Sequence, residues 1–185
     1  MKRKKSILLR TLTVVLIIGL HPIASAQWQA DSDDKLQVKA AQAIDNIKTK
    51  IERSHPFFED AYAYAIWPGI TRVAVGFGGA YGKGLVVEQN KAVGTVKYWQ
   101  FSSGIQAGAK NFSMIVFFKD KKSLESLQRG EMQFAGQAGV DLLTMGAHGT
   151  PGYSAGVAII PLTKLGLMAE FSASGVKYNY KPYSK

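Results

Sequence analysis

The chain has 185 residues, 46% of them hydrophobic, with 23 basic and 13 acidic side chains and a formal net charge of +10. It contains no cysteine, which excludes disulfides, thiol catalysis, cysteine metal sites and an acylated lipoprotein N-terminus. The length suits a single domain whose core needs no covalent cross-link.

Residues 1–26 have the pattern of an export signal. A basic stretch up to Arg10 precedes a short apolar run, Thr11 to Leu20, and Ala24-Ser25-Ala26 forms a small-residue cleavage site before Gln27. We therefore expect a protein that is periplasmic or secreted after cleavage, with 27–185 as its single domain. The alternative is a retained N-terminal anchor that leaves the protein membrane-associated.

The charge of the mature chain follows from this assignment. Five basic residues leave with the signal, so the net charge becomes 18 − 13 = +5. An exported basic protein meets anionic lipid or envelope polymer, and we expect no nucleic-acid partner.

The first mature segment, from Asp34 to about Arg53, has a helical pattern of apolar residues at three- and four-residue steps. The cations of this helix cluster beside the apolar stripe: Lys35, Lys39, Lys50 and Arg53. That arrangement is typical of a helix at a membrane interface, but also of a helix packed on a sheet with its other side in water. We favour packing, because a surface helix often sorts its charges by chance.

The remainder of the chain is rich in short strand patterns. His55-Pro56 starts a second short helix, Pro68-Gly69 predicts a turn, Gln89-Asn90 predicts a hairpin tip, and Asp120 caps a third helix that ends at Gly130. The predicted strands are 63–67, 72–80, 84–88, 92–101, 104–110, 113–118, 132–140, 154–160 and 167–180. We therefore expect an α+β fold, with N-terminal helices packed on a large curved antiparallel sheet that forms a barrel or sandwich.

Glycines are concentrated after Pro68, most densely from Gly76 to Gly84. Side chains alternate along a strand, so Gly78 and Gly82 belong to a face that is almost bare. Such a face predicts either a tightly curved sheet corner or the close approach of a ligand. We expect these glycines to serve folding.

The sequence contains partial matches to catalytic motifs, but the residues around each match do not fit the motif. Gly152 to Gly156 matches the nucleophile elbow, but a strand pattern follows it and no histidine comes after Ser154. Gly82-Lys83 lacks the remaining residues of a phosphate loop. Only His55 and His148 remain in the mature chain. We expect no catalytic residue, no metal site and no cofactor, and hence a protein that is not an enzyme.

The C-terminus alternates bases and tyrosines in Lys177, Tyr178, Tyr180 and Lys181. Tyrosine and lysine suit a membrane interface, and lysines also protect an edge strand from pairing with another chain. Both interpretations remain open.

Several ordered segments resemble the SYLF family, over about Leu36 to Tyr180. They are Ala65 to Gly69, Gly76 to Gly84, Ser103 to Ala109, Phe134 to Val140, Gly166 to Ala169 and Gly175 to Tyr178. The resemblance implies a non-enzymatic lipid-binding module, and places lipid contact on the N-terminal helix that holds Lys35, Lys39, Lys50 and Arg53. Some members of the family bind actin or phosphoinositides, but an exported bacterial-type member would meet neither, so actin is an unlikely partner.

The function expected from the resemblance is therefore that of an envelope protein that binds anionic phospholipid or a membrane surface. The alternative is a structural or protein-interaction module whose partner is another envelope protein.

Export predicts a defined mature N-terminus. N-terminal sequencing of the protein from its native host should begin at Gln27, because the small residues before it suit signal peptidase. Recovery of the chain with Met1 intact on the cytoplasmic side would contradict both the export and the envelope assignment.

Overall fold

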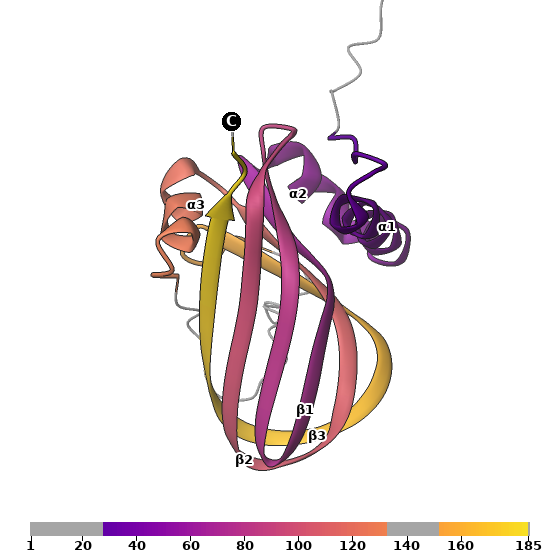
Figure 1. The fold of residues 1–185 in the computed structure, drawn as a ribbon, viewed down its shortest axis with the longest axis vertical. Helices are drawn as coiled ribbons and strands as arrows, with labels where there is room; N and C mark the ends of the chain where they lie inside the picture. The colour runs from indigo at the N-terminus through magenta and orange to yellow at the C-terminus, as the bar shows by residue number, and fades with distance from the viewer. Residues whose placement is uncertain (1–27, 133–151, 185) are drawn as a thin grey trace, which may run out of the picture.

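The computed structural model describes residues 28–132 and 152–184 (Figure 1). In chain order the elements are α1 (Lys35–Lys50), the 3-10 turn η1 (Glu52–Ser54), α2 (His55–Asp60), β1 (Ala63–Glu88), β2 (Lys91–Phe118), α3 (Lys121–Gln128) and β3 (Val157–Pro182). The fold class is α+β, as predicted, with α1 packed on β1. No helix in the described ranges is long and apolar enough to cross a membrane.

The sheet consists of three very long antiparallel strands in the order β1-β2-β3. The predicted segments 63–67, 72–80 and 84–88 are all parts of β1, and those from 92 to 118 are all parts of β2. The turn predicted at Pro68-Gly69 is wrong, because the strand passes through an irregularity in register there without ending. The hairpin at Gln89-Asn90 is confirmed, and both residues have the positive φ that a tight turn requires. The strand predicted over 132–140 lies largely outside the described residues.

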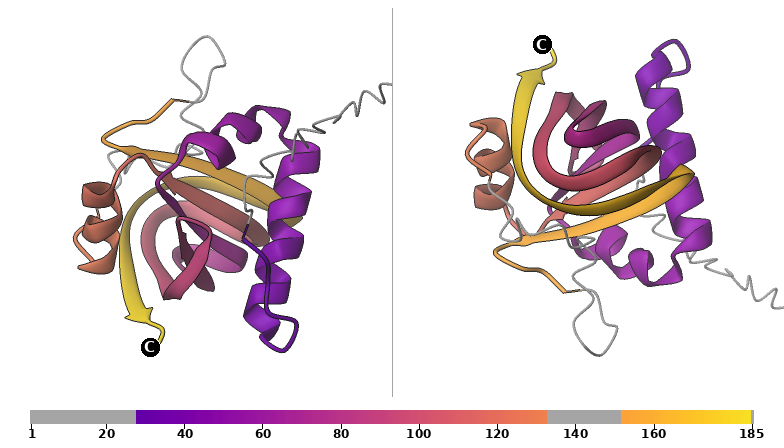
Figure 2. Two further views of the ribbon diagram at one scale, coloured as in Figure 1. Left: turned by 90° about the horizontal axis from the view of Figure 1, so that it is seen from above. Right: turned by 90° about the horizontal axis from the view of Figure 1, so that it is seen from below.

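Each strand bends near its middle, so that the sheet folds over on itself (Figures 1 and 2). The bend in β1 coincides with a shift in register between Val75 and Phe77, where Gly76 has a φ of 71°. The bend is tight along β1 and wide along β3, as the view from above shows (Figure 2). Within the described parts β1 does not pair with β3, so the expected barrel is not closed.

The glycines of β1 let its two halves touch. A Cβ on Gly82 would lie 2.7 Å from Ile70 Cγ1 and 2.9 Å from the carbonyl oxygen of Gly69, and one on Gly84 would lie 2.7 Å from the carbonyl oxygen of Ile66. A Cβ on Gly78 would lie 2.6 Å from that of Ala74. The bare face is therefore packed against the same strand, as a curved sheet corner requires.

Two apolar clusters hold the fold. The first fills the space inside the folded sheet and includes Trp67, Tyr98 and Tyr178 together with Leu124 and Leu127 of α3. The second joins the outer face of the sheet to the N-terminal helices. Its buried members are Trp28, Ala40, Ala43, Ile44, Ile47, Phe57, Ile66, Leu85, Val87, Ile115, Phe117, Ala158 and Ile160. The helices thus cover one end of the outer face, and the bend lies at the other end (Figure 1).

A buried polar cluster lies inside the sheet, next to the bend. The guanidinium of Arg72 donates to Gln100 Oε1 at 2.9 Å and to Ser102 Oγ at 3.1 Å. Gln106 in turn donates from Nε2 to the carbonyl oxygen of Gly76 at 2.9 Å. These bonds connect the backbone of the bend to β2, since a buried polar group must be hydrogen-bonded to avoid a large desolvation cost.

The close contact within β1 predicts a position-specific cost of adding one methyl group. Gly82→Ala should lower the free energy of unfolding by about 1–3 kcal/mol, because backbone atoms of the facing segment cannot move away cheaply. Urea denaturation of the mature domain measures this difference.

Gly79→Ala is the matched control. Its Cβ would meet only the Gln100 carbonyl oxygen at 3.8 Å, an ordinary contact, and Gly79 is exposed. Equal stability of the two variants would show that the two halves of β1 do not press on each other at Gly82.

Candidate anion-binding cleft between helix α1 and the sheet

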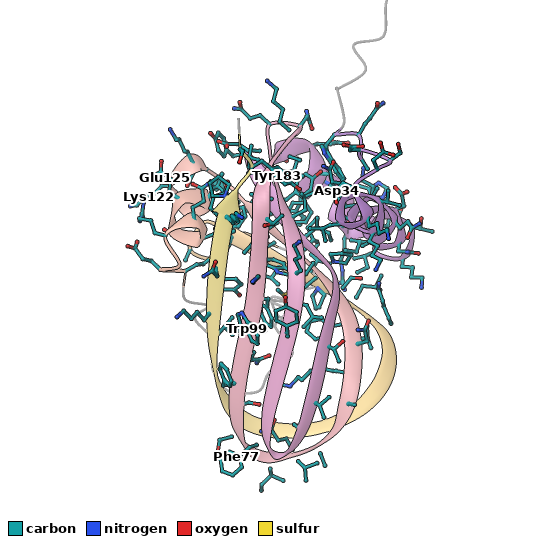
Figure 3. All side chains as sticks on the ribbon, in the orientation of Figure 1. Asp34, Phe77, Trp99, Lys122, Glu125 and Tyr183 are labelled. Atoms are coloured by element: carbon teal, nitrogen blue, oxygen red, sulfur yellow. The ribbon has the colours of Figure 1, made fainter. Side chains whose placement is uncertain are left out.

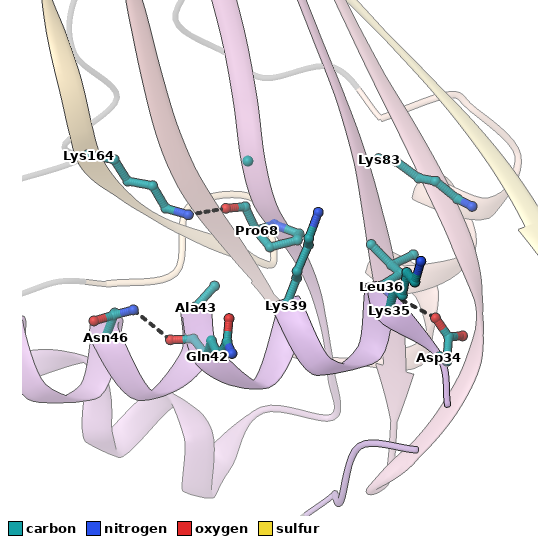
Figure 4. Close-up of a pocket in the computed structure, with 11 residues that line it drawn as sticks. Asp34, Lys35, Leu36, Lys39, Gln42, Ala43, Asn46, Pro68, Lys83 and Lys164 are labelled. Atoms are coloured by element: carbon teal, nitrogen blue, oxygen red, sulfur yellow. Dashed lines mark hydrogen bonds between the residues drawn. The ribbon is translucent and has the colours of Figure 1, made fainter. Parts of the chain in front are cut away.

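A cleft of about 730 Å³ lies between α1 and the folded sheet (Figure 4). One wall is α1, and the opposite wall consists of Pro68, Gly69 and Lys83 of β1 with Lys164 of β3. The residues from α1 and its N-cap are Asp34, Lys35, Leu36, Lys39, Gln42, Ala43 and Asn46. The cleft is therefore built from three segments that are distant in sequence.

Helix α1 is held against the sheet by its apolar face and by its N-terminal cap. Ala40, Ala43, Ile44 and Ile47 are buried, which leaves the adjoining lysines at the rim. Asp34 Oδ1 accepts hydrogen bonds from the backbone N–H groups of Leu36 at 2.8 Å and Gln37 at 3.2 Å. This cap satisfies backbone donors that would otherwise have no partner in the helix.

The carboxylate of Asp34 thus acts as the N-cap of α1. Its partial burial raises its pKa, but the hydrogen bonds from Leu36 and Gln37, together with that from Tyr183, outweigh this effect and lower the pKa from its ordinary value. Tyr183 Oη lies 3.3 Å from Asp34 Oδ2, which also ties the C-terminal segment to α1.

The cleft carries an excess of positive charge. Four of its lining residues are lysines, and Asp34 is its one carboxylate. Lys164 Nζ donates to the carbonyl oxygen of Pro68. The ion pairs near α3 join Glu125 and Glu131 to Lys121 and Arg129 and do not include a cleft lysine. With Leu36, Ala43 and Pro68 as apolar lining, the cleft suits an anionic group on an apolar carrier.

The predicted cations of α1 do not form one site. Lys35 and Lys39 line the cleft, whereas Lys50 and Arg53 are exposed at the other end of the helix region. Lys35 and Lys50 are separated by about 22 Å along the helix axis, at 1.5 Å per residue. The structure instead brings Lys83 and Lys164 to the first pair, which sequence spacing alone could not reveal.

The C-terminal residues divide between two faces of β3. Lys177 and Lys181 are exposed, but Tyr178 is only 2% exposed and packs against Trp67 and Tyr98, with ring centroids 5.8 and 5.7 Å away. Burial raises the pKa of Tyr178 well above its ordinary value. A membrane-contact role for Tyr178 does not fit this position.

Tyr180 is half-buried, and its hydroxyl donates to the carbonyl oxygen of Val93 at 3.0 Å. The alternation of strand side chains was the signal in the sequence that the bases and the tyrosines occupy opposite faces.

The catalytic motif at Ser154 has no elbow geometry. Ser154 forms a bridge with Val157, and the chain continues into β3 instead of a helix. Within the described residues no group of three or more potential ligands could hold a metal ion. His148 and the segment Phe134 to Val140 lie outside those residues.

Comparison of the chain with family models, with curated proteins and with solved structures finds no match. The SYLF resemblance therefore rests on the residues quoted for it.

The cap at Asp34 predicts a pH-dependent contribution to stability. Asp34→Ala should lower the free energy of unfolding by about 1 kcal/mol at neutral pH, as is usual for loss of an N-cap. Because the pKa of Asp34 is lower in the folded protein, its contribution is present above the ordinary value of 3.8 and is lost as pH falls through the folded pKa.

Denaturation of wild type and variant across acidic pH measures this difference, which should shrink towards zero at the lowest pH. Asp33→Ala is the control, since it removes a neighbouring charge that does not cap the helix. An equal loss in both variants would assign the effect to general charge.

Proposed function

We propose that this protein is an exported, non-enzymatic component of the cell envelope that binds anionic lipid surfaces through its SYLF-like domain. The observation that carries the proposal is the cleft between α1 and the sheet, which is lined by four lysines and by one carboxylate, the N-cap Asp34. Phosphate-bearing headgroups are the anions that an envelope protein meets at high density.

The wider charge distribution supports a surface as the partner. Apart from the buried Arg72, the three strands contain seven basic residues against two acidic ones, Glu88 and Glu170; the basic residues are Lys83, Lys91, Lys97, Lys110, Lys164, Lys177 and Lys181. Lys83 and Lys97 are directly opposite each other in the β1–β2 ladder and are both exposed. Like charges in that position repel each other, and a bound anion relieves the repulsion.

The alternative is a protein-interaction module without lipid specificity. It is favoured by the position of β3, which is an edge strand of the described sheet and could accept a strand from another protein. The lysines at 177 and 181 work against such pairing.

Vesicle flotation distinguishes the two functions. The mature domain should bind vesicles that contain phosphatidylglycerol and should ignore vesicles of phosphatidylcholine alone, and binding should weaken as salt is raised. Replacing Lys35, Lys39 and Lys83 by Gln should weaken binding by about 3 kcal/mol at low salt, because each lysine near an anionic surface contributes about 1 kcal/mol.

The matched control replaces Lys119, Lys121 and Lys122 by Gln. These exposed lysines lie at α3, away from the cleft, and the variant has the same net charge. Equal losses in both variants would remove the cleft from the mechanism, and binding of neither vesicle by the wild type would leave the interaction module as the function.

A further inference from the structure

The bend of the sheet exposes a cluster of large apolar side chains, which we call the apolar tip. Its members, defined by exposure on the outer face around the bend, are Val73, Val75 and Phe77 of β1 with Phe101 and Ile105 of β2. Phe77 and Ile105 are 79% and 82% exposed. Figure 3 places Phe77 at the end of the molecule opposite the helices.

The apolar tip results from the way residues are distributed between the inner and outer faces of the sheet. The inner face at the bend is filled by Gly78, Ala74 and the Arg72 cluster, and the second apolar cluster occupies only the far end of the outer face. Outside residues 165–174 of β3, the large hydrophobic side chains that are exposed in the described chain all lie in the parts of β1 and β2 from Val73 to Tyr81 and from Trp99 to Ile105. A concentration of this kind marks an interaction surface, because single exposed apolar residues are otherwise scattered.

The residues next to the tip change in a fixed order along the strands. Tyr81 and Trp99 form a cross-strand pair with ring centroids 4.5 Å apart, and Lys83 and Lys97 form the next outward-facing pair. At about 3.3 Å per residue, the aromatic pair is about 13 Å and the lysine pair about 20 Å along β1 from Phe77. This order matches a bilayer, in which apolar side chains enter hydrocarbon, aromatic rings occupy the interface and lysines reach the headgroups.

The charged residues around the apolar tip indicate which partner binds it. Between Ile70 and Gly84, and between Gly94 and Phe112, the charged residues of β1 and β2 are all basic, and the carboxylate that the neighbouring strand β3 brings to the bend is Glu170, which pairs with Gln106. A second copy of this chain would bring the same lysines face to face, whereas an anionic bilayer complements them.

We propose that the apolar tip inserts into the hydrocarbon edge of an anionic bilayer, with Tyr81 and Trp99 at the interface and Lys83 and Lys97 at the headgroups. The inference rests on the proposed function and adds the inserting surface to it. Lys83 belongs both to the lysine pair next to the tip and to the cleft. A sheet that is inclined to the bilayer therefore turns one continuous surface, from Phe77 to α1, towards the lipid.

The test compares two variants of the mature domain in flotation on phosphatidylglycerol-containing vesicles. Replacing Phe77, Phe101 and Ile105 by Thr keeps residues suited to strands but removes apolar area, and should weaken binding at least about tenfold, since burying even one such side chain is worth that much. Replacing the same residues by Leu keeps the apolar area and should retain most of the binding.

Trp99 supplies a second readout. Trp28 and Trp67 are 9% and 0% exposed and Trp99 is 41% exposed, so a blue shift of tryptophan emission on adding vesicles reports Trp99. The shift should occur in the wild type and be absent in Trp99→Phe.

The contrary outcomes show whether this inference fails alone or together with the proposed function. Wild-type protein that does not float would overturn both. Floating by the wild type, with equal binding of the Thr variant and no blue shift, would overturn the inserted tip alone. A Thr variant that is less stable or changes oligomeric state, yet binds vesicles normally, would assign the tip to a protein contact and overturn the insertion.

Discussion

The fold depends on the approach of β1 to itself. Gly82 and Gly84 place backbone against the backbone of Gly69 and Ile66, at distances that leave no room for a Cβ. This contact allows a strand of 26 residues to turn back without ending. β2 follows the bend because it is paired with β1 along its length, and β3 follows because it is paired in the same way with β2. The inner core, the uncovered bend and the open side along β3 all follow from that one constraint.

The same bend places polar and apolar groups in unusual positions. Arg72 is 5% exposed and is hydrogen-bonded to Gln100, Ser102 and Gln106 on the inner face next to the bend. The large apolar residues of the bend face outward as the apolar tip. Polar groups inside and apolar groups outside are a reversal of the usual order, and such reversals in stable folds are associated with function.

The cleft and the tip are two ends of one basic surface in the proposed mechanism. Electrostatic attraction acts over about 10 Å at moderate salt and would orient the domain before contact. Insertion of apolar side chains acts only on contact and is insensitive to salt. The two contributions can therefore be separated by ionic strength as well as by mutation.

Local patterns in the sequence were sufficient for the helices, the hairpin at Gln89-Asn90, the packed glycine face and the α+β class, because these depend on neighbouring residues and on strand or helix periodicity. The turn expected at Pro68 was wrong, and of the two expected forms, barrel or sandwich, the closed barrel was wrong, since whether a bend ends a strand or closes a sheet depends on distant pairing. Lys35 and Lys39 were identifiable from helical spacing, but Lys83 and Lys164 reach the same cleft from separate strands. Tertiary structure alone decided that cleft, the burial of Tyr178 and the exposure of Phe77, because each depends on which faces the folded sheet brings together.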